Sequence, residues 1–432
     1  MTDKTEPAGL RLRLAAAKRL RAVLAGENFS PLATADLADG RDRALANRLM
    51  TTALRRHGQL DVIIAELLEK GLPPRSGSFE AVLRLSLTQL VFLPDLGAHS
   101  ALFLAVEATK RDAKSRHLSG LMNAVLRRAQ ANSARFGMLD DALLLPMPFA
   151  DTWRQAYGDA ALMDFPRALL EGAPLDLTLR DDDPGLAEAL GGELVMADTL
   201  RLEQRDRPVD ALPFYNEGRW WVQDAAAAIP ARLMTARAGG RILDLCAAPG
   251  GKTAQLVKAG YRVTALDSDA ARMARLEQNL DRLGYQAETV IADAIGFTPD
   301  RPFDGVLLDA PCSATGTFRR HPEVIWNRTA ADVAGRVRLQ RTLITNAYRC
   351  LEAGGILIYC VCSLEPAEGE EQLDWVLNTL PGLEFLPVAQ SELPDLAAAV
   401  TDRGAVRTHP GLTPGEGAGG MDGFFVARFR RR

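Results

Sequence analysis

Apolar residues recur at intervals of three and four along the first third of the chain. Residues 62–68, 79–93 and 102–113 follow this spacing, and residues 73–77, which include two prolines, interrupt it. Such spacing places apolar side chains on one face of a helix, and proline breaks the pattern. The sequence therefore predicts a compact all-α helical bundle over residues 1–135.

Residues 136–219 follow a different pattern, in which proline-rich turns alternate with one strand-like run at residues 175–179. A short alternating run between turns is typical of a strand in a small mixed element. We predict a small α+β connector over this segment and interpret it as an RNA-binding subdomain.

The last part of the chain alternates short apolar runs with helical patterns. Its strand candidates are residues 241–245, 262–266, 288–292, 305–309 and 355–361, and its clearest helices are residues 269–283 and 329–350. This alternation predicts a doubly wound, mostly parallel sheet with right-handed crossovers. We expect a Rossmann-like α/β domain over residues 220–432, with residues 423–429 as a final edge strand.

Composition changes this picture little. The chain has 432 residues, more than one core normally supports, with 47% hydrophobic and 25% charged residues. The amino terminus does not have the pattern of a secretory signal, and no apolar run approaches the ~18 residues of a membrane span, so we expect a soluble cytoplasmic protein. The five cysteines include no Cys-x-x-Cys pair, which argues against zinc and leads us to expect free thiols and no metal.

Charge is distributed unevenly, although the net charge is only −4. Residues 10–21 hold five basic residues and no acidic one, and further basic groups follow at 55–56, 110–111, 114–116 and 127–128. A single basic pair is usually a solvated helix face. Because so many occur in one predicted domain, we interpret that domain as facing RNA.

A glycine-rich turn follows the first predicted strand of the α/β domain. Gly250 and Gly251 lack side chains where the backbone must approach a ligand, and the next helix begins there. The turn matches neither the Gly-x-Gly-x-x-Gly fingerprint nor a Walker loop, so a nucleoside without a diphosphate is the better ligand. Asp267, Asp293 and Asp309 each follow a strand. One such Asp is usually a turn residue, but three beside this turn favour adenosine, and hence S-adenosylmethionine.

Two thiols stand at predicted strand ends. Cys312 and Cys362 are 50 residues apart in sequence, yet adjacent parallel strands would bring them to one pocket. We interpret Cys350 and Cys360 as buried hydrophobic residues, and Cys246 as a packing residue close to the ligand. A disulfide between Cys312 and Cys362 stays open as an alternative, although a reducing cytosol disfavours it.

A thiol beside a methyl donor suits one difficult reaction. Carbon 5 of cytosine is a poor nucleophile until a thiolate adds to carbon 6. Asp309 is placed to hydrogen-bond the ring nitrogen and stabilise the charge that develops on addition. A second group must then help remove the proton on carbon 5.

Several motifs of the chain resemble the Sun/RsmB family of RNA cytosine-C5 methyltransferases. They are residues 222–224, 246–253, 309–317, 320–323, 361–363 and 422–425. The resemblance implies a class I S-adenosylmethionine-dependent fold in which Cys362 is the nucleophile and Cys312 assists release of the methylated RNA. It also implies the cofactor contacts Cys246, Ala247, Ala248, Pro249, Gly250, Gly251, Lys252, Asp267, Asp293 and Asp309.

The amino-terminal third resembles NusB-type RNA-binding domains at residues 79–85, 105–110 and 122–128. This pairing is typical of the bacterial enzyme that methylates small-subunit (16S) ribosomal RNA, so the resemblance implies that partner, unassembled or partly assembled, and a monomer. Val361, Ala314 and Gly369 stand where the family usually has threonine, glycine and asparagine. None of the three removes a reacting group.

Two alternatives remain at this point. A tRNA cytosine-C5 methyltransferase shares the catalytic motifs but not usually the helical domain. A non-catalytic antitermination or ribosome-assembly factor would use the helical domain alone, and the retained Cys312, Cys362 and glycine turn disfavour it.

Overall fold

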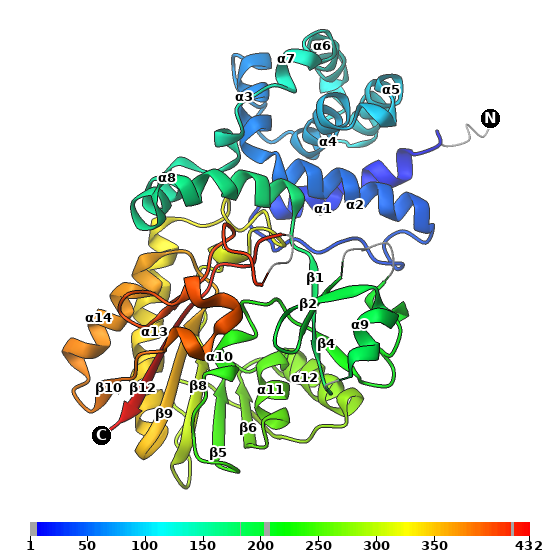
Figure 1. Ribbon diagram of the computed structural model, residues 1–432. Helices are drawn as coiled ribbons and strands as arrows, with labels where there is room; N and C mark the ends of the chain where they lie inside the picture. Colours follow the sequence, from blue (N-terminus) through cyan, green and yellow to red (C-terminus); the bar gives the residue numbers. More distant parts are fainter. Residues whose placement is uncertain (1–6, 182, 203–207, 416–418) are drawn as a thin grey trace. The chain divides into compact units, whose positions relative to one another are not determined.

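A computed structural model describes residues 7–181, 183–202, 208–415 and 419–432 (Figure 1). The chain divides into two compact units. The first comprises Met1–Asp151, Leu169–Glu171 and His321–Asn327, and the second comprises Thr152–Ala168, Gly172–Arg320 and Arg328–Arg432. The two units do not test the expected three-part division at residues 135 and 219, which stays a prediction.

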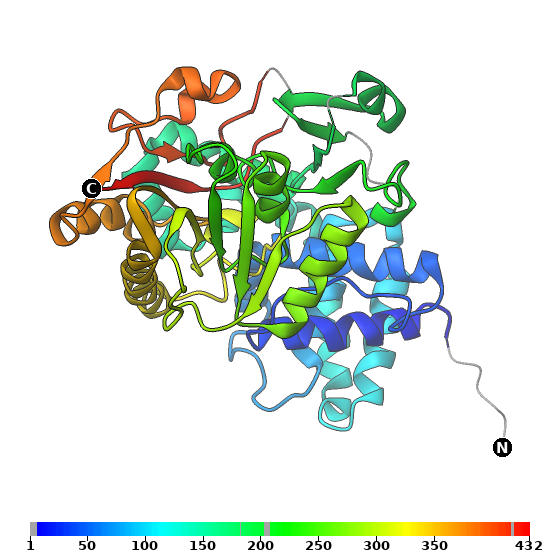
Figure 2. The ribbon, with the colours of Figure 1, turned by 90° about the horizontal axis from the view of Figure 1, so that it is seen from below.

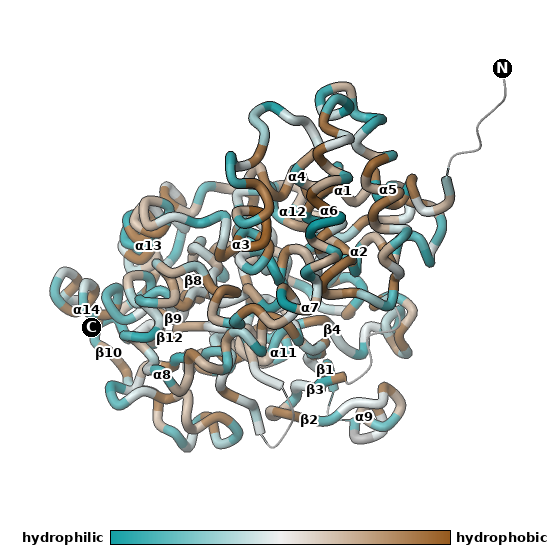
Figure 3. The backbone as a smooth tube through the Cα atoms, turned by 90° about the horizontal axis from the view of Figure 1, so that it is seen from above, coloured by the Kyte–Doolittle hydropathy of each residue, from teal (hydrophilic) through white to brown (hydrophobic). Residues whose placement is uncertain are grey.

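The first unit is the expected helical bundle. Its helices are α1 (Leu10–Leu24), α2 (Gly40–Arg55), α3 (His57–Leu67), α4 (Phe79–Phe92), α5 (Ala98–Arg111), α6 (Ser119–Ala131) and α7 (Ser133–Phe136). Helix α4 packs against α1, α2, α5 and α6 and is buried along most of its length. Most helices alternate brown and teal along the chain in Figure 3, as one buried and one exposed face require.

Polar side chains buried in α4 find partners within the bundle. The hydroxyls of Ser86 and Thr88 donate to carbonyls one turn earlier, and the Gln89 amide donates to the Leu96 and Gly97 carbonyls. Arg13 of α1 donates to the Gln89 side-chain oxygen at 2.6 Å. These bonds remove the cost of leaving polar groups unpaired inside the core.

The connector segment leads into the second unit. Helix α8 (Met147–Glu171) is interrupted at Gly158, whose φ of 80° is not helical. After it comes an antiparallel sheet in the order β2-β3-β1-β4, formed by β1 (Leu175–Leu179), β2 (Gly192–Met196), β3 (Thr199–Leu202) and β4 (Trp220–Val222), with helix α9 (Pro184–Leu190). The one predicted strand, β1, is therefore confirmed, and it pairs with β3 on one side and β4 on the other.

The larger sheet has the order β10-β12-β9-β8-β5-β6-β7, with β11 paired to β12. Its strands are β5 (Arg241–Leu245), β6 (Arg262–Asp267), β7 (Glu288–Ile291), β8 (Phe303–Asp309), β9 (Leu351–Val361), β10 (Leu383–Phe385), β11 (Val406–Arg407) and β12 (Phe425–Arg431). Strands β5 to β9 pair in parallel. The predicted strands and parallel core are confirmed.

One strand was misplaced. The carboxy-terminal run was expected at the sheet edge, but β12 lies between β9 and β10 and pairs antiparallel with both (Figures 1 and 2). The edge is β10, whose three residues are too short a run to stand out in an apolar pattern.

Helices cover both faces of this sheet. Leu307, Ile358 and Val426 pack with α10 (Ile229–Arg232) and α11 (Gly251–Lys258) on one face. Their neighbours in sequence, such as Val306 and Leu357, pack with α13 (Ala330–Cys350) and α14 (Glu370–Thr379) on the other. A further helix, α12 (Ala270–Leu283), packs beside β6 and β7. No helix in the described part of the chain is long and apolar enough to cross a membrane.

Candidate active site

The glycine-rich turn joins the end of β5 to the start of α11. Gly250 caps this helix with a φ of 102°, a region that only glycine enters without strain. A Cβ on it would lie 2.8 Å from Leu276 Cγ of α12. The turn therefore needs glycine both for its backbone angles and for its packing.

A cavity of about 240 Å³ lies beside this turn at the carboxyl ends of the parallel strands. The predicted site residues that line it are Ala247, Ala248, Pro249, Gly250, Gly251, Lys252, Asp309 and Cys362. It thus joins a candidate cofactor cradle to a candidate nucleophile. Cys246, Asp267, Asp293 and Cys312 are not among its lining residues.

Asp267 ends β6 and turns back toward the glycine-rich turn. Its side chain is 3% exposed and accepts the backbone N–H groups of Ala248, at 3.2 Å, and Asp269, at 3.0 Å. Arg272 lies 3.5 Å away as an ion-pair partner. The carboxylate therefore holds the turn directly, in contact with a residue that lines the cavity.

Asp293 follows β7 but takes a different position. Its side chain is exposed and accepts the backbone N–H of Ile295 at 2.9 Å, as a turn residue does. The strand register brought Asp267 and Asp309 close to the cavity, whereas Asp293 faces solvent.

Asp309, at the end of β8, forms an ion pair with Lys252 across the cavity. Lys252 Nζ lies 2.7 Å from one carboxylate oxygen, and the Cys360 thiol donates to the other at 3.5 Å. The Lys252 ammonium also lies 5.3 Å from the centre of the Phe424 ring. Burial is the largest single influence and lowers the pKa of Lys252, but the charge and hydrogen bond of Asp309, together with the nearby Cys360 and Cys362, outweigh it, and the net pKa is raised.

A further carboxylate, Asp244, was missed in the sequence because it lies inside the apolar run of β5. It is fully buried and accepts the Thr253 hydroxyl at 2.6 Å, which ties the strand to α11. Its other oxygen has no hydrogen-bond partner. Burial raises the pKa of Asp244 to about 7, against the effect of the Thr253 bond.

Carboxylates surround the turn, and Lys252 and Arg272 pair with two of them. Burial, followed by the negative charges of Asp309, Asp267 and Asp244, raises the pKa of Cys246 to about 12. These carboxylates gather beside a bare backbone turn that leaves room for a ligand. S-Adenosylmethionine carries a sulfonium and an ammonium, so the residues present fit it.

The two thiols predicted to converge do so. Cys312 Sγ and Cys362 Sγ are 3.4 Å apart, and both are free cysteines. Cys362 opens onto the cavity. The hydrogen bond to Cys362, then burial, raises the pKa of Cys312 well above its ordinary value, which keeps that thiol protonated. Cys350 and Cys360 are buried, as expected.

Other residues also line the cavity, and the sequence pattern alone predicted no role for them. Arg320 lines it and donates from Nε to Asp422 at 2.8 Å, across 102 residues of sequence. Asp224, which also lines it, accepts the backbone N–H of Asp422 at 3.3 Å. These residues fall within the motifs that resemble the Sun/RsmB family, and that resemblance was the only sign in the sequence that they belong to the site.

Two of the departures from the family pattern have visible consequences. Ala314, two residues after Cys312, has a φ of 60°, the left-handed region that suits the usual glycine. At Gly369 a Cβ would lie 2.2 Å from Arg407 Nη2. The Arg407 side chain fills this space and donates to the Ser363 carbonyl at 2.5 Å.

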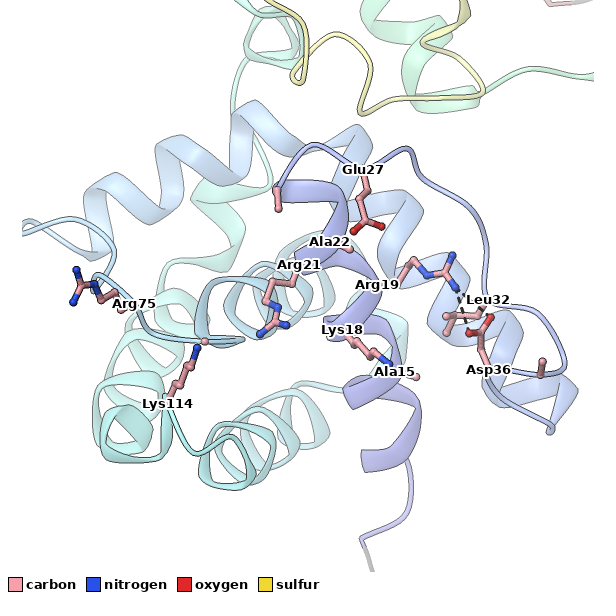
Figure 4. A pocket seen from close by; sticks show the side chains of 13 residues that line it. Ala15, Lys18, Arg19, Arg21, Ala22, Glu27, Leu32, Asp36, Arg75 and Lys114 are labelled. Carbon is pink, nitrogen blue, oxygen red and sulfur yellow. Dashed lines mark hydrogen bonds and ion pairs between the residues drawn. The ribbon is translucent and has the colours of Figure 1, made fainter. Parts of the chain in front are cut away.

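The basic residues of the helical unit fall into two groups. Some are held internally, because Arg13, Arg56 and Arg128 donate to nearby acceptors. Others gather in a cleft of about 1160 Å³ between α1 and the segments that carry Arg75 and Lys114 (Figure 4). Its charged lining residues are Lys18, Arg19, Arg21, Glu27, Asp36, Arg75 and Lys114. Within the described residues, Arg19 and Asp36 are the ones among them that form an ion pair.

Comparison with known proteins gives consistent matches. Residues 231–430 match the family described as 16S rRNA methyltransferase RsmB/F, and residues 11–131 match the NusB family. The chain is 35% identical to ribosomal RNA small subunit methyltransferase B of Xanthomonas campestris pv. campestris, covering 90% of this chain and 92% of that protein. It is 34% identical to the protein of the same name from Pseudomonas putida, covering 96% and 97%.

Solved structures share the fold. The crystal structure of PH0851 matches with a TM-score of 0.74 at 22% identity over all of both chains. A methyltransferase homolog protein from Pyrococcus horikoshii matches with a TM-score of 0.57 at 26% identity, covering 68% of this chain and 99% of that one.

Proposed function

This chain belongs to the RsmB/F family of 16S rRNA methyltransferases and carries a NusB-family domain at its amino terminus, and from this premise we propose its reaction. It transfers a methyl group from S-adenosylmethionine to carbon 5 of a cytosine in small-subunit ribosomal RNA. The transfer passes through a covalent bond between Cys362 and the RNA. The observation that carries the proposal is the position of Cys362, which lines one cavity with the glycine-rich turn and Asp309.

When bound, S-adenosylmethionine supplies an electrophilic methyl group. Gly250, Gly251 and the neighbouring backbone would hold it, with Asp267 and Asp293 as contacts for the adenosine end. Asp244 and Asp309 contribute negative charge that favours a cation at the turn. Cys246 stays a thiol there and serves packing.

Cys362 begins the reaction on the base. Its sulfur bonds to carbon 6 of the ring, and the electron pair of the 5,6 double bond makes carbon 5 nucleophilic toward the methyl group. Asp309 is held at the cavity by Lys252 and the Cys360 thiol. Because the ring nitrogen accepts a hydrogen bond, Asp309 acts there as the donor, with its proton supplied by the Lys252 ammonium 2.7 Å away as charge develops on the ring.

Cys312 completes the reaction. The hydrogen bond to Cys362 is the main cause of the raised pKa of Cys312. When the sulfur of Cys362 bonds to carbon 6, this cause is removed. Cys312 is then free to help take the proton from carbon 5. The carbon–sulfur bond breaks, the double bond returns and Cys362 leaves as a thiolate.

The basic cleft of the helical unit supports an RNA-facing role for that unit. Lys18, Arg21, Arg75 and Lys114 line it beside only two carboxylates. Phosphates attract such clusters through charge and counterion release. We propose a cytoplasmic monomer that acts on ribosomal RNA before the small subunit is fully assembled.

A methyl-transfer assay tests the reaction. The protein is incubated with tritiated S-adenosylmethionine and either protein-free 16S rRNA, assembled small subunits or bulk tRNA. Labelled 5-methylcytosine is expected in protein-free 16S rRNA first. Label only in tRNA would make the substrate wrong, and absence of label in every RNA would make the activity wrong.

A charge-matched pair of variants tests the cleft. Arg21→Ser with Lys114→Ser removes two cleft cations, whereas Lys110→Ser with Arg111→Ser removes two cations that pair with Glu107. The first double variant should lower the slope of log K against log salt by roughly 1.4–1.8, and the second by much less. Equal slopes in the two would remove the cleft from the RNA surface.

A further inference from the structure

A buried carboxylate lies behind the two thiols. Glu368 belongs to the short 3-10 turn that follows β9 (Pro366–Glu368) and is fully buried. It is absent from the cavity lining, so it does not touch the space where a base would react.

Its carboxylate is bonded to the residue that follows each cysteine. Ser313, next to Cys312, donates its backbone N–H to Oε1 at 2.9 Å and its hydroxyl to Oε2. Ser363, next to Cys362, donates its hydroxyl to Oε2 at 2.6 Å. Gln340 of α13 donates to Oε1 at 2.9 Å and anchors the carboxylate to the helix layer.

No Lys or Arg forms an ion pair with Glu368 in the described part of the chain, so hydrogen-bond donors alone compensate its burial. Burying a carboxylate in this way is costly compared with a neutral side chain of similar size. A single acceptor group that bridges both loops also fixes their separation, which an apolar contact would leave adjustable. The Sγ–Sγ distance of 3.4 Å is the separation that results.

We propose that Glu368 is a positioning residue that clamps the Cys312 and Cys362 loops together, so that one thiol attacks while the other stands ready to resolve the adduct. The inference rests on the proposed two-thiol function for its purpose. The clamp itself acts through Ser313 and Ser363 and needs neither RNA nor cofactor. Its negative charge also adds to the raised pKa of Cys312, after the bond to Cys362 and burial.

Thiol oxidation measures the clamp without catalysis. Diamide oxidises two adjacent thiols to a disulfide and is itself reduced to the hydrazine, and mass spectrometry follows closure of the Cys312–Cys362 bond. Closure should be at least tenfold slower in Glu368→Ala than in the wild type and intermediate in Glu368→Gln, which keeps one acceptor oxygen. Glu371→Gln, an exposed neighbour with the same charge change, should close at the wild-type rate.

Kinetics supply the second readout. In Glu368→Ala the kcat should fall at least tenfold, with the cofactor Kd and the KM for RNA within twofold of wild type. If that variant does not fold, Ser313→Ala with Ser363→Ala removes both hydroxyl donors and is expected to slow closure in the same way. Closure and kcat within twofold of wild type would overturn the clamp. Glu368-dependent closure in a protein that methylates no RNA would instead overturn the proposed function and leave the clamp standing.

Discussion

Replacing Asp309 with asparagine leaves the Lys252 ammonium without its ion-pair partner. The two groups are 2.7 Å apart, and their side chains are 31% and 10% exposed. Removing one partner of a fully buried pair costs about 3–5 kcal/mol, since the other charge stays buried and uncompensated. Because Asp309 is partly hydrated, we expect Asp309→Asn to lower the free energy of unfolding by about 2–3 kcal/mol at pH 7.

The loss should depend on pH. In the variant, burial lowers the pKa of Lys252 below its unfolded value because the opposing charge is gone. The folded variant then binds fewer protons than the unfolded chain at alkaline pH, so its stability rises as pH approaches ~10.4. The stability gap between wild type and Asp309→Asn should therefore narrow from pH 7 to pH 9.

Urea unfolding of the cofactor-free protein, followed by tryptophan fluorescence and circular dichroism, measures both effects. Lys252→Met combined with Asp309→Asn removes both charges, so the double variant should recover most of the loss, with a coupling energy of about 2 kcal/mol. Single-variant effects that add within about 0.5 kcal/mol would refute the account of the pair.

Three further outcomes follow from the site. Ala314→Gly should raise the free energy of unfolding by about 0.5–1 kcal/mol in urea titrations, because relief of the left-handed strain exceeds the added chain entropy; an unchanged or lower value would count against strain there. Calorimetry should show weaker cofactor binding by about 1.5–3 kcal/mol in Asp267→Ala, and a smaller loss in Asp293→Ala because that side chain is exposed; an unchanged Kd in Asp267→Ala would remove that residue from the cofactor site. Asp244 has a folded pKa of about 7, above its unfolded value, so its share of stability is present at low pH and lost as pH rises through 7; the wild type should lose roughly 1 kcal/mol more than Asp244→Asn between pH 6 and pH 8, and equal losses would contradict the raised pKa.

The fold was predictable wherever one pattern decided it. Runs such as residues 241–245 and 305–309 are apolar over the length of one strand, and β5 and β8 contain them. The sheet edge was not predictable, since β10 has three residues and pairs with a strand near the chain end. Strand order depends on such pairings between distant parts of the chain, and the local spacing of apolar residues carries no information about them.

The site was predictable as far as strand ends define it. Parallel strands end at one edge, which brought Lys252, Asp309 and Cys362 to one cavity. The direction of a side chain after a strand was not predictable, and Asp293 faces solvent although Asp267 faces the turn. Counting cations likewise did not separate those held within the helical unit from those that line its cleft.

The most direct test of the account is covalent capture of RNA by the two thiol variants. Labelled 16S rRNA and S-adenosylmethionine are incubated with each variant, and the products are separated by electrophoresis in denaturant. Cys312→Ala should methylate and then accumulate a denaturation-resistant protein–RNA adduct, whereas Cys362→Ala should give neither adduct nor methylation. An adduct in Cys362→Ala but not in Cys312→Ala would reverse the two roles, and no adduct in either variant would contradict the two-thiol mechanism.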